Sequence, residues 1–197
     1  MNRAPSLALL ALLALAACTD YIEEGTIEGS LVVPDCEDGE GARFTCAGDT
    51  LEDCDAFRLD IDFFALDFLG DQATLSLQEG GRPFGQADGL ALQIRDVRQL
   101  RGRLGQSIPV GPNANVRAAL GLFDRCPDST QNFELTGAVT FRRFGVDRGD
   151  RVTGTIDRLE VRDGRAADGR PGPVLGLLRG DFDFILRVGP PYQRFTR

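Results

Sequence analysis

The sequence predicts an all-β fold: an antiparallel β-sandwich or jelly-roll-like barrel of about eight strands, with at most one short helix. From Thr26 onward the dominant hydrophobic period is two, as in strands with one buried face. Turns rich in Gly, Pro and Asp separate the alternating runs. Helical spacing is confined to the stretch with Val97, Leu100 and Leu104. There we expect a short helix that closes one end of the barrel.

The alternating runs define the expected strands. In residues 57–69 the apolar side chains alternate from Phe57 to Phe63 and then continue one residue out of phase from Phe64. Such a switch is typical of a β-bulge, or of a strand that passes from one sheet to the other. Residues 152–161 contain a second switch. The other expected strands are 26–33, 73–78, 90–95, 116–123, 133–141 and 178–188.

The first eighteen residues form a separate unit. Arg3 precedes an apolar run that ends in Leu15-Ala16-Ala17-Cys18. The run is too short to cross the ~30 Å hydrocarbon core of a bilayer, which needs about 20 apolar residues. A positive start, a short apolar region and small residues before a cleavage point are the parts of a secretory signal. The segment resembles a bacterial lipoprotein signal with its lipobox, and the resemblance covers this export signal alone.

The resemblance implies a mature protein that begins at Cys18, with diacylglycerol on the sulfur and usually a third acyl chain on the amine. Two or more acyl chains anchor a protein stably, whereas one binds only marginally. Thr19 follows the cysteine, where lipoproteins kept in the inner membrane typically carry Asp. We therefore expect an outer-membrane protein of a Gram-negative envelope, facing the periplasm or the cell surface. An ordinary secretory signal with an incidental Cys18 is the alternative.

The chain is expected to divide into a signal peptide over 1–17, a lipidated tether over 18–25 and a single β-sandwich domain over 26–197. The 180 residues after the signal are enough for one domain with its own core. The stretch from Thr19 to Gly25 spans at most about 25 Å when extended. The domain is therefore expected to work close to the membrane.

Four further cysteines follow the lipobox, at Cys36, Cys46, Cys54 and Cys126. An even number in an oxidising compartment indicates two disulfides. Three pairings are open, and we prefer Cys46–Cys54 within one turn and Cys36–Cys126 across the fold. The alternative is a zinc site of four thiolates, but the sequence has no Cys-x-x-Cys pair that would favour it.

Missing residue types restrict the chemistry. The chain contains no His, Lys or Trp, and all 22 basic residues are Arg. Without His there is no Ser-His-Asp or Cys-His catalytic unit and no histidine-ligated metal. Neither a nucleophile elbow nor a Gly-rich phosphate loop is present. We expect no enzymatic activity, no metal and no cofactor. Without Arg3 the mature part carries 21 basic and 30 acidic residues, which argues against nucleic-acid binding.

Two pairs of carboxylates form a candidate site. Asp60 and Asp62 are expected on one strand face, as are Asp181 and Asp183, because residues i and i+2 point the same way. Such pairs could serve a glycosidase-like enzyme or a calcium-dependent binder. Charge that alternates with buried apolar residues is also ordinary strand patterning, and this interpretation is preferred.

A local basic cluster in this acidic chain is the second candidate. It consists of Arg95, Arg98, Arg101 and Arg103. These arginines could contact anionic lipid headgroups or an acidic partner. A solvated face that balances neighbouring aspartates is the ordinary alternative.

The sequence therefore predicts a membrane-anchored envelope lipoprotein that acts as a non-catalytic binding or structural module. The alternatives are an accessory subunit of an envelope complex, a carboxylate-dependent enzyme and a calcium-dependent binder. The enzyme requires two carboxylates that face one concave pocket, whereas the module requires only an exposed surface. The expected partners are the membrane, through the lipid, and an envelope protein. The oligomeric state is left open.

Overall fold

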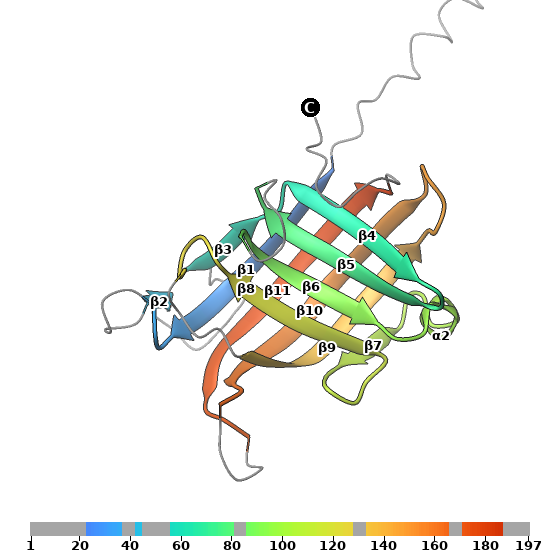
Figure 1. The fold of residues 1–197 in the computed structure, drawn as a ribbon. Coiled ribbons are helices and arrows are strands. Elements are labelled where there is room, and N and C mark those ends of the chain that lie inside the picture. Colours follow the sequence, from blue (N-terminus) through green and yellow to red (C-terminus); the bar gives the residue numbers. More distant parts are fainter. Residues whose placement is uncertain are drawn as a thin grey trace, which may run out of the picture.

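The computed structural model describes residues 23–36, 42–44, 56–80, 86–127, 133–165 and 171–186. These residues form strands, connecting turns and one short helix (Figure 1). The elements are β1 (Glu24–Val33), β2 (Ala42–Phe44), β3 (Phe57–Asp60), β4 (Phe63–Leu69), β5 (Gln72–Glu79), β6 (Asp88–Ile94), α2 (Val97–Arg101), β7 (Ser107–Val110), β8 (Val116–Leu122), β9 (Phe133–Phe144), β10 (Arg151–Asp163) and β11 (Val174–Ile185).

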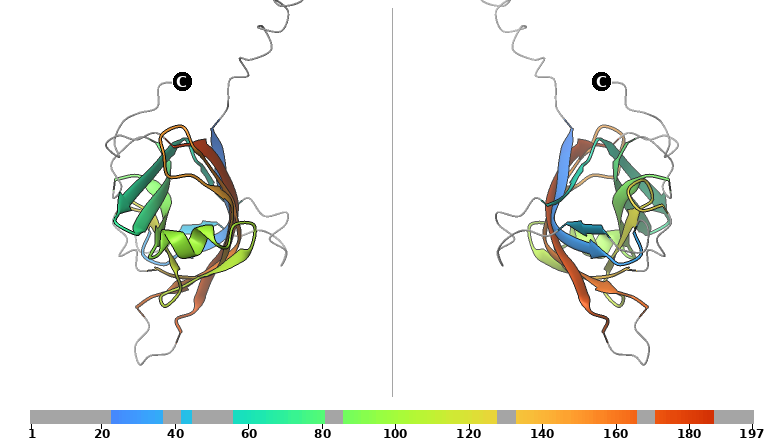
Figure 2. Two further views of the ribbon diagram at one scale, coloured as in Figure 1. Left: turned by 90° about the vertical axis from the view of Figure 1, so that its right-hand side faces the viewer. Right: turned by 90° about the vertical axis from the view of Figure 1, so that its left-hand side faces the viewer.

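All the strands belong to one sheet that curls into a half-barrel (Figure 2). Their order is β2-β1-β11-β10-β9-β7-β8-β6-β5-β4, and β3 pairs with β1 beside this path. The prediction of an all-β fold with a short helix is confirmed. The sheet is mixed rather than antiparallel throughout, because β7 pairs with β8 in parallel through Val110 and Val116.

The strand count differs from the expected eight, since the described residues contain eleven strands. The short strands β2 and β7 have three and four residues, which is too few for an alternating pattern to show. The expected strand 57–69 is divided into β3 and β4. These two facts account for the difference.

The phase switch in 57–69 marks the place where the chain changes its partner. The first part, β3, pairs with β1, and the second part, β4, pairs with β5. Between them the backbone N–H of Ile61 donates to Gly25 O at 2.9 Å, and that of Asp62 donates to Gln78 O at 3.2 Å. One segment thus pairs with β1 in its first part and with β5 in its second, within a single sheet rather than between the two sheets that the sequence analysis considered. The second switch coincides with a register irregularity between Ile156 and Leu159.

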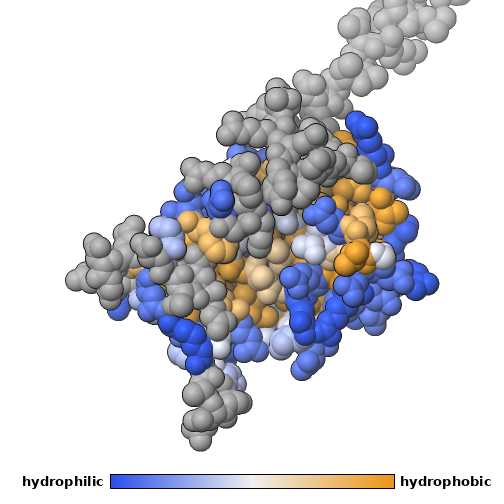
Figure 3. Space-filling view, viewed as in Figure 1, coloured by the Kyte–Doolittle hydropathy of each residue, from blue (hydrophilic) through white to orange (hydrophobic). Residues whose placement is uncertain are grey.

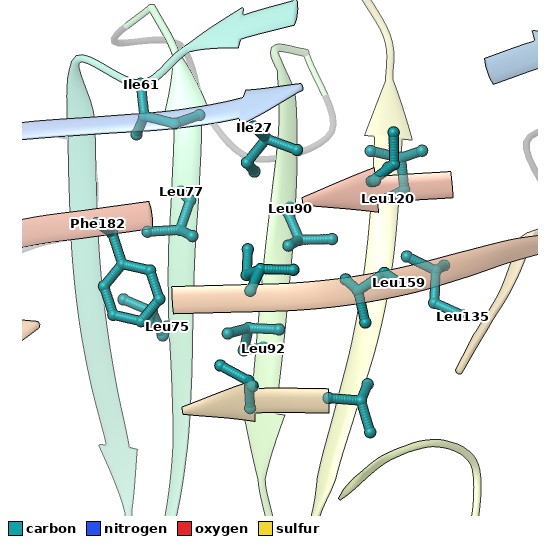
Figure 4. Packing of buried hydrophobic residues seen from close by; sticks show 14 of the residues in the cluster. Ile27, Ile61, Leu75, Leu77, Leu90, Leu92, Leu120, Leu135, Leu159 and Phe182 are labelled. Atoms are coloured by element: carbon teal, nitrogen blue, oxygen red, sulfur yellow. The ribbon is translucent and has the colours of Figure 1, made fainter. Parts of the chain in front are cut away.

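The inward side chains of both halves of the sheet form one core (Figure 4). Leu75 and Leu90 of the front strands point toward Leu159 and Phe182 of the back strands, and all four are at most 1% exposed. Burying one such side chain stabilises the fold by about 1.5–3 kcal/mol. The two halves are therefore held together by a continuous apolar interior.

Glycines in the back strands allow the sheet to curl tightly around these large side chains. Gly154 of β10 lies between Phe141 and Phe182 of the neighbouring strands. A Cβ atom there would lie 2.5 Å from the Phe182 Cζ and 2.8 Å from Thr140 O. Glycine in a strand interior commonly marks such a close approach.

The helix α2 closes one end of the half-barrel, which we call the α2 end. Val97 and Leu100 are buried in the core. The Asp96 side chain accepts a hydrogen bond from the Gln99 N–H at 2.9 Å and so caps the first turn. The expected short helix is confirmed, although Leu104 lies beyond its last residue and is 37% exposed.

A disulfide closes the opposite end. Cys36, after β1, is bonded to Cys126, after β8, with their Cα atoms 5.0 Å apart. This predicted pairing is confirmed. The bond links two parts of the chain that are not neighbours in the sheet order. Cys46 and Cys54 lie outside the described residues, as does the whole segment 1–22 with Cys18. In the described part of the chain, no helix is long and apolar enough to cross a membrane.

Candidate functional site

The four candidate aspartates lie outside the core but do not form one site. Asp60 and Asp181 are both in register with Thr26, one on each side of β1. Two strand spacings, about 10 Å, therefore separate their backbones. Asp62 lies beyond β3, where its side chain accepts from Gly80 N at 2.6 Å. Asp183 is held by the Arg151 guanidinium, with Nε at 2.7 Å from Oδ1.

Asp60 and Asp181 lie among ion pairs on the outer face of the strands. Arg58 Nε lies 2.9 Å from the Asp60 carboxylate, and the Arg58 guanidinium also contacts Glu28 at 3.4 Å. Burial raises the pKa of Asp181, and repulsion from Glu24 and Glu28 raises it further. Exposed ion pairs of this kind contribute about 0–1 kcal/mol each. The arrangement is that of a solvated strand face.

These positions do not provide the two carboxylates in one pocket that a glycosidase-like enzyme requires. Asp62 and Asp183 are each engaged by a different neighbour, and Asp60 is 69% exposed at its side chain. Within the described ranges, no group of three His, Cys, Asp or Glu side chains could hold a metal ion.

The four candidate arginines are brought together around α2. Arg98 pairs with Asp71 of the β4–β5 turn at 2.6 Å. Arg95 donates to Pro112 O at 2.7 Å, and Arg103 donates to Ser107 O at 3.0 Å. Arg101 is exposed in the last turn of the helix. Arg95, Arg98 and Arg103 thus bond to neighbouring segments, and the charges of the four arginines remain at the surface of the α2 end.

A groove beside α2 is the site that sequence reasoning did not find. It has a volume of about 510 Å³ and lies on the outward side of β4, β5, β6 and β8. Strand register places four polar residues in one row across these strands, in the order Asp67, Thr74, Gln93 and Arg117. The row faces outward because its neighbours along the strands, such as Leu75 and Leu92, are buried. We call these four residues the polar row.

The two ends of the groove carry opposite charge. Arg117 Nε and Arg95 Nη2 both donate to Pro112 O at 2.7 Å, so two guanidinium groups lie side by side at one end. Asp67 stands at the other end, three strand spacings or about 14 Å away. The groove can therefore attract an anionic group to its arginine end and a cationic or hydrogen-bond-donating group to the other.

Apolar side chains border the acidic end of the groove. Phe68 is 40% exposed and Leu69 is 80% exposed. Figure 3 shows apolar side chains over the front strands and hydrophilic ones beside α2. Ligand sites typically combine apolar walls with a few polar groups in cavities of about 300–1,000 Å³. The groove has both the volume and the mixture of residues for a small ligand or a short chain segment.

A third cluster of charge lies at the disulfide end and is structural. Asp88, which is 2% exposed, accepts from Asp124 N at 2.8 Å and from Arg125 Nε at 3.1 Å. The Arg125 guanidinium also pairs with Glu79 at 2.6 Å and lies 5.7 Å from the centre of the Phe57 ring. Burial raises the pKa of Glu79, an effect that Arg125 opposes. The cluster fixes the turn that carries Cys126.

Comparison of the chain with protein-family models, with curated protein sequences and with solved structures gave no match in any of the three.

Proposed function

We propose that this chain is a lipid-anchored protein of the bacterial outer membrane that acts as a non-catalytic binding module. The lipobox Leu15-Ala16-Ala17-Cys18 supports the anchor and the compartment. The Cys36–Cys126 disulfide is consistent with an oxidising compartment. We also propose that the half-barrel is a sandwich-like fold, because its two halves face each other across one core.

The groove beside α2 is the observation that carries the binding function. Arg95 and Arg117 lie at one end, exposed Phe68 and Leu69 lie at the other, and Thr74 and Gln93 lie between them. A ligand that fits this sequence of groups is elongated, with an anionic group at the arginine end and an apolar part against Phe68 and Leu69. The groove offers charge, hydrogen bonds and apolar contact, which are the requirements of binding.

Site-specific photo-cross-linking in intact cells tests this function. A photoreactive amino acid replaces Gln72, an exposed residue of the groove, and in the matched control it replaces Arg158, an exposed residue of β10. Intact-mass analysis of the purified chain then detects small-molecule and protein adducts alike. We expect an adduct at position 72 that is absent at position 158. No adduct at either position, or the same adduct at both, contradicts a binding site in the groove.

The accessory-subunit alternative is decided by the same experiment. A discrete protein adduct at position 72 that disappears in the untethered Cys18→Ala variant identifies a subunit of an envelope complex. A small-molecule adduct identifies a carrier or sensor instead. The carboxylate-dependent enzyme and the calcium-dependent binder gain no support from the positions of Asp60, Asp62, Asp181 and Asp183.

A further inference from the structure

The groove beside α2 lies between two rows of outward side chains. The polar row forms one wall. Residues two positions apart on a strand share its face, and three lining residues each lie two positions from a member of the polar row. These three, Leu69, Gln72 and Arg95, form the second wall. Because both rows cross β4, β5 and β6, the groove runs across the strands, and a ligand that fills it lies perpendicular to them.

The arginine end of the groove is held in place by the loop that precedes β8. Arg117 Nε and Arg95 Nη2 both donate to Pro112 O at 2.7 Å. The loop is fixed in turn, because Asn115 Oδ1 accepts from Asp96 N at 2.9 Å and Asn115 Nδ2 donates to Asp96 O at 3.0 Å. A guanidinium has five N–H donors, so most of the donors on both arginines remain for a ligand.

The two arginines of the groove differ from most others in their partners. Arg58, Arg98 and Arg151 each pair with a carboxylate. No carboxylate of the described residues pairs with Arg95 or Arg117. Two guanidinium groups that are already positioned and carry no counter-charge bind a carboxylate well, since charge-assisted hydrogen bonds are the strong ones.

The opposite end of the groove has a carboxylate beside apolar side chains. Asp67 is exposed, and neither a hydrogen bond nor an ion pair joins its side chain to another residue in the described part of the chain. Phe68 and Leu69, which are 40% and 80% exposed, follow it directly. This end suits an ammonium group that has an apolar side chain next to it.

The middle of the groove is uncharged and polar on both walls. Thr74 and Gln93 lie on one wall and Gln72 on the other. A glutamine amide both donates and accepts hydrogen bonds, as a peptide group does. An extended peptide directs its N–H and C=O groups to both sides and can therefore pair with both walls. An acyl chain in the same place would leave the amides without partners, which is unfavourable.

We propose that the groove binds a short peptide with free ends. Its terminal carboxylate lies between Arg95 and Arg117, its terminal ammonium lies at Asp67, and its first side chain packs on Phe68 and Leu69. This inference rests on the proposed function, because it names the ligand class of the same groove.

The length of the peptide follows from the strand spacing. The backbones of Asp67 and Arg117 are three strand spacings, or about 14 Å, apart. An extended peptide spans about 3.3–3.6 Å per residue. About four residues therefore join the two ends, whereas a dipeptide reaches only one of them.

Retention of peptide pools by the purified chain tests the proposal. The mature chain in detergent is mixed with a pool of random tetrapeptides that are free at both ends, and mass spectrometry identifies the peptides retained on ultrafiltration. Detergent alone is the blank. Matched pools carry an N-terminal acetyl group or a C-terminal amide. We expect the amide to lower retention about tenfold, because it removes the charge at the arginines. We expect the acetyl group to lower it about threefold, because Asp67 is an exposed single charge.

Variants assign each effect to one end of the groove. The double variant Arg95→Gln, Arg117→Gln should lose the preference for a free carboxylate and keep the preference for a free ammonium. Asp67→Asn should do the reverse. The matched control Arg143→Gln, Arg158→Gln changes two exposed arginines of β9 and β10 and should keep both preferences. Circular dichroism checks the fold of each variant.

Two results overturn the peptide assignment. One is equal retention of the free and amidated pools by the original chain. The other is a preference that persists in the arginine variant, since the peptides then bind elsewhere. An adduct at position 72 without retention of any peptide pool refutes the peptide and leaves the proposed function standing. Absence of both the adduct and peptide retention contradicts the groove as a binding site altogether.

Discussion

Gly154 sets the distance between the back strands and the large side chains of the core. We predict that Gly154→Ala destabilises the fold by about 1–3 kcal/mol, because its Cβ would overlap the Phe182 ring and Thr140 O. Gly111→Ala is the matched control, since its Cβ would meet only Thr136 Cγ2, at 3.8 Å. Urea unfolding of the two variants measures the difference. Equal stabilities would mean that the sheet relaxes around the added methyl group.

Asp181 is a residue whose charge works against the fold. Because burial and the nearby Glu24 and Glu28 raise its pKa in the folded state, ionisation of its carboxyl destabilises the protein as the pH rises above the usual value of 3.8. We predict that Asp181→Asn raises the urea midpoint at pH 7. Near pH 2.5, where the carboxyl is protonated in both states, the variant and the original chain should have the same midpoint. A lower midpoint for the variant at pH 7 contradicts this account.

The turn after β8 shows how one buried carboxylate supports a whole element. Asp88 accepts from two backbone N–H groups of this turn and from the Arg125 side chain. We predict that Asp88→Ala costs about 2–4 kcal/mol in the free energy of unfolding, because it leaves these donors without their acceptor. Glu79→Ala should cost less than about 1 kcal/mol, since Glu79 is 40% exposed at its side chain. Denaturant titration compares the two, and equal costs would contradict the central role of Asp88.

The disulfide joins two elements that the sheet does not join directly. Cys36 and Cys126 are 90 residues apart in the sequence. We predict that replacing both with Ser lowers the free energy of unfolding by about 2–5 kcal/mol, chiefly by freeing the unfolded chain. Reduction of the original chain under mild denaturation should have a similar effect. Unchanged stability after replacement would mean that the core and the Asp88 cluster alone hold this end.

The elements differ in how well the sequence predicts them. Strands with six or more alternating residues are visible in the sequence, and so is the partner change within 57–69, because each inward side chain must be apolar. The short β7 contains Pro109, and its position in the sheet is set by its pairing with β9 and β8. Its parallel pairing with β8 depends on tertiary packing rather than on local pattern.

The groove could not be predicted because it depends on register. Asp67, Thr74, Gln93 and Arg117 are unremarkable outward residues of four different strands. Only the order and alignment of these strands place them in one row. Arg95 was a candidate on charge alone, but its neighbour Arg117 was not, since Arg117 lies 22 positions further along the chain. The sequence signal for the groove is a polar, outward-facing residue near one end of each of the four strands. This signal can be used only once the strand register is known.

The whole molecule has two outward surfaces of different character. The back strands β3, β1 and β11 carry paired charges, whereas the front strands β4, β5, β6 and β8 carry the groove. The groove lies toward the end of β4, whereas the start of β1 lies beside Ile61 and Phe64, at the start of β4.

The central claim is that Cys18 anchors this domain to a membrane. Mass spectrometry of the N-terminal peptide of the mature protein, purified from the membrane fraction, tests it most directly. The account predicts a chain that begins at Cys18 and carries the mass of a diacylglycerol, usually with one further acyl chain. The Cys18→Ala variant should lose this modification and leave the membrane fraction. A mature chain that begins at another residue, or an unmodified Cys18, would contradict the anchor.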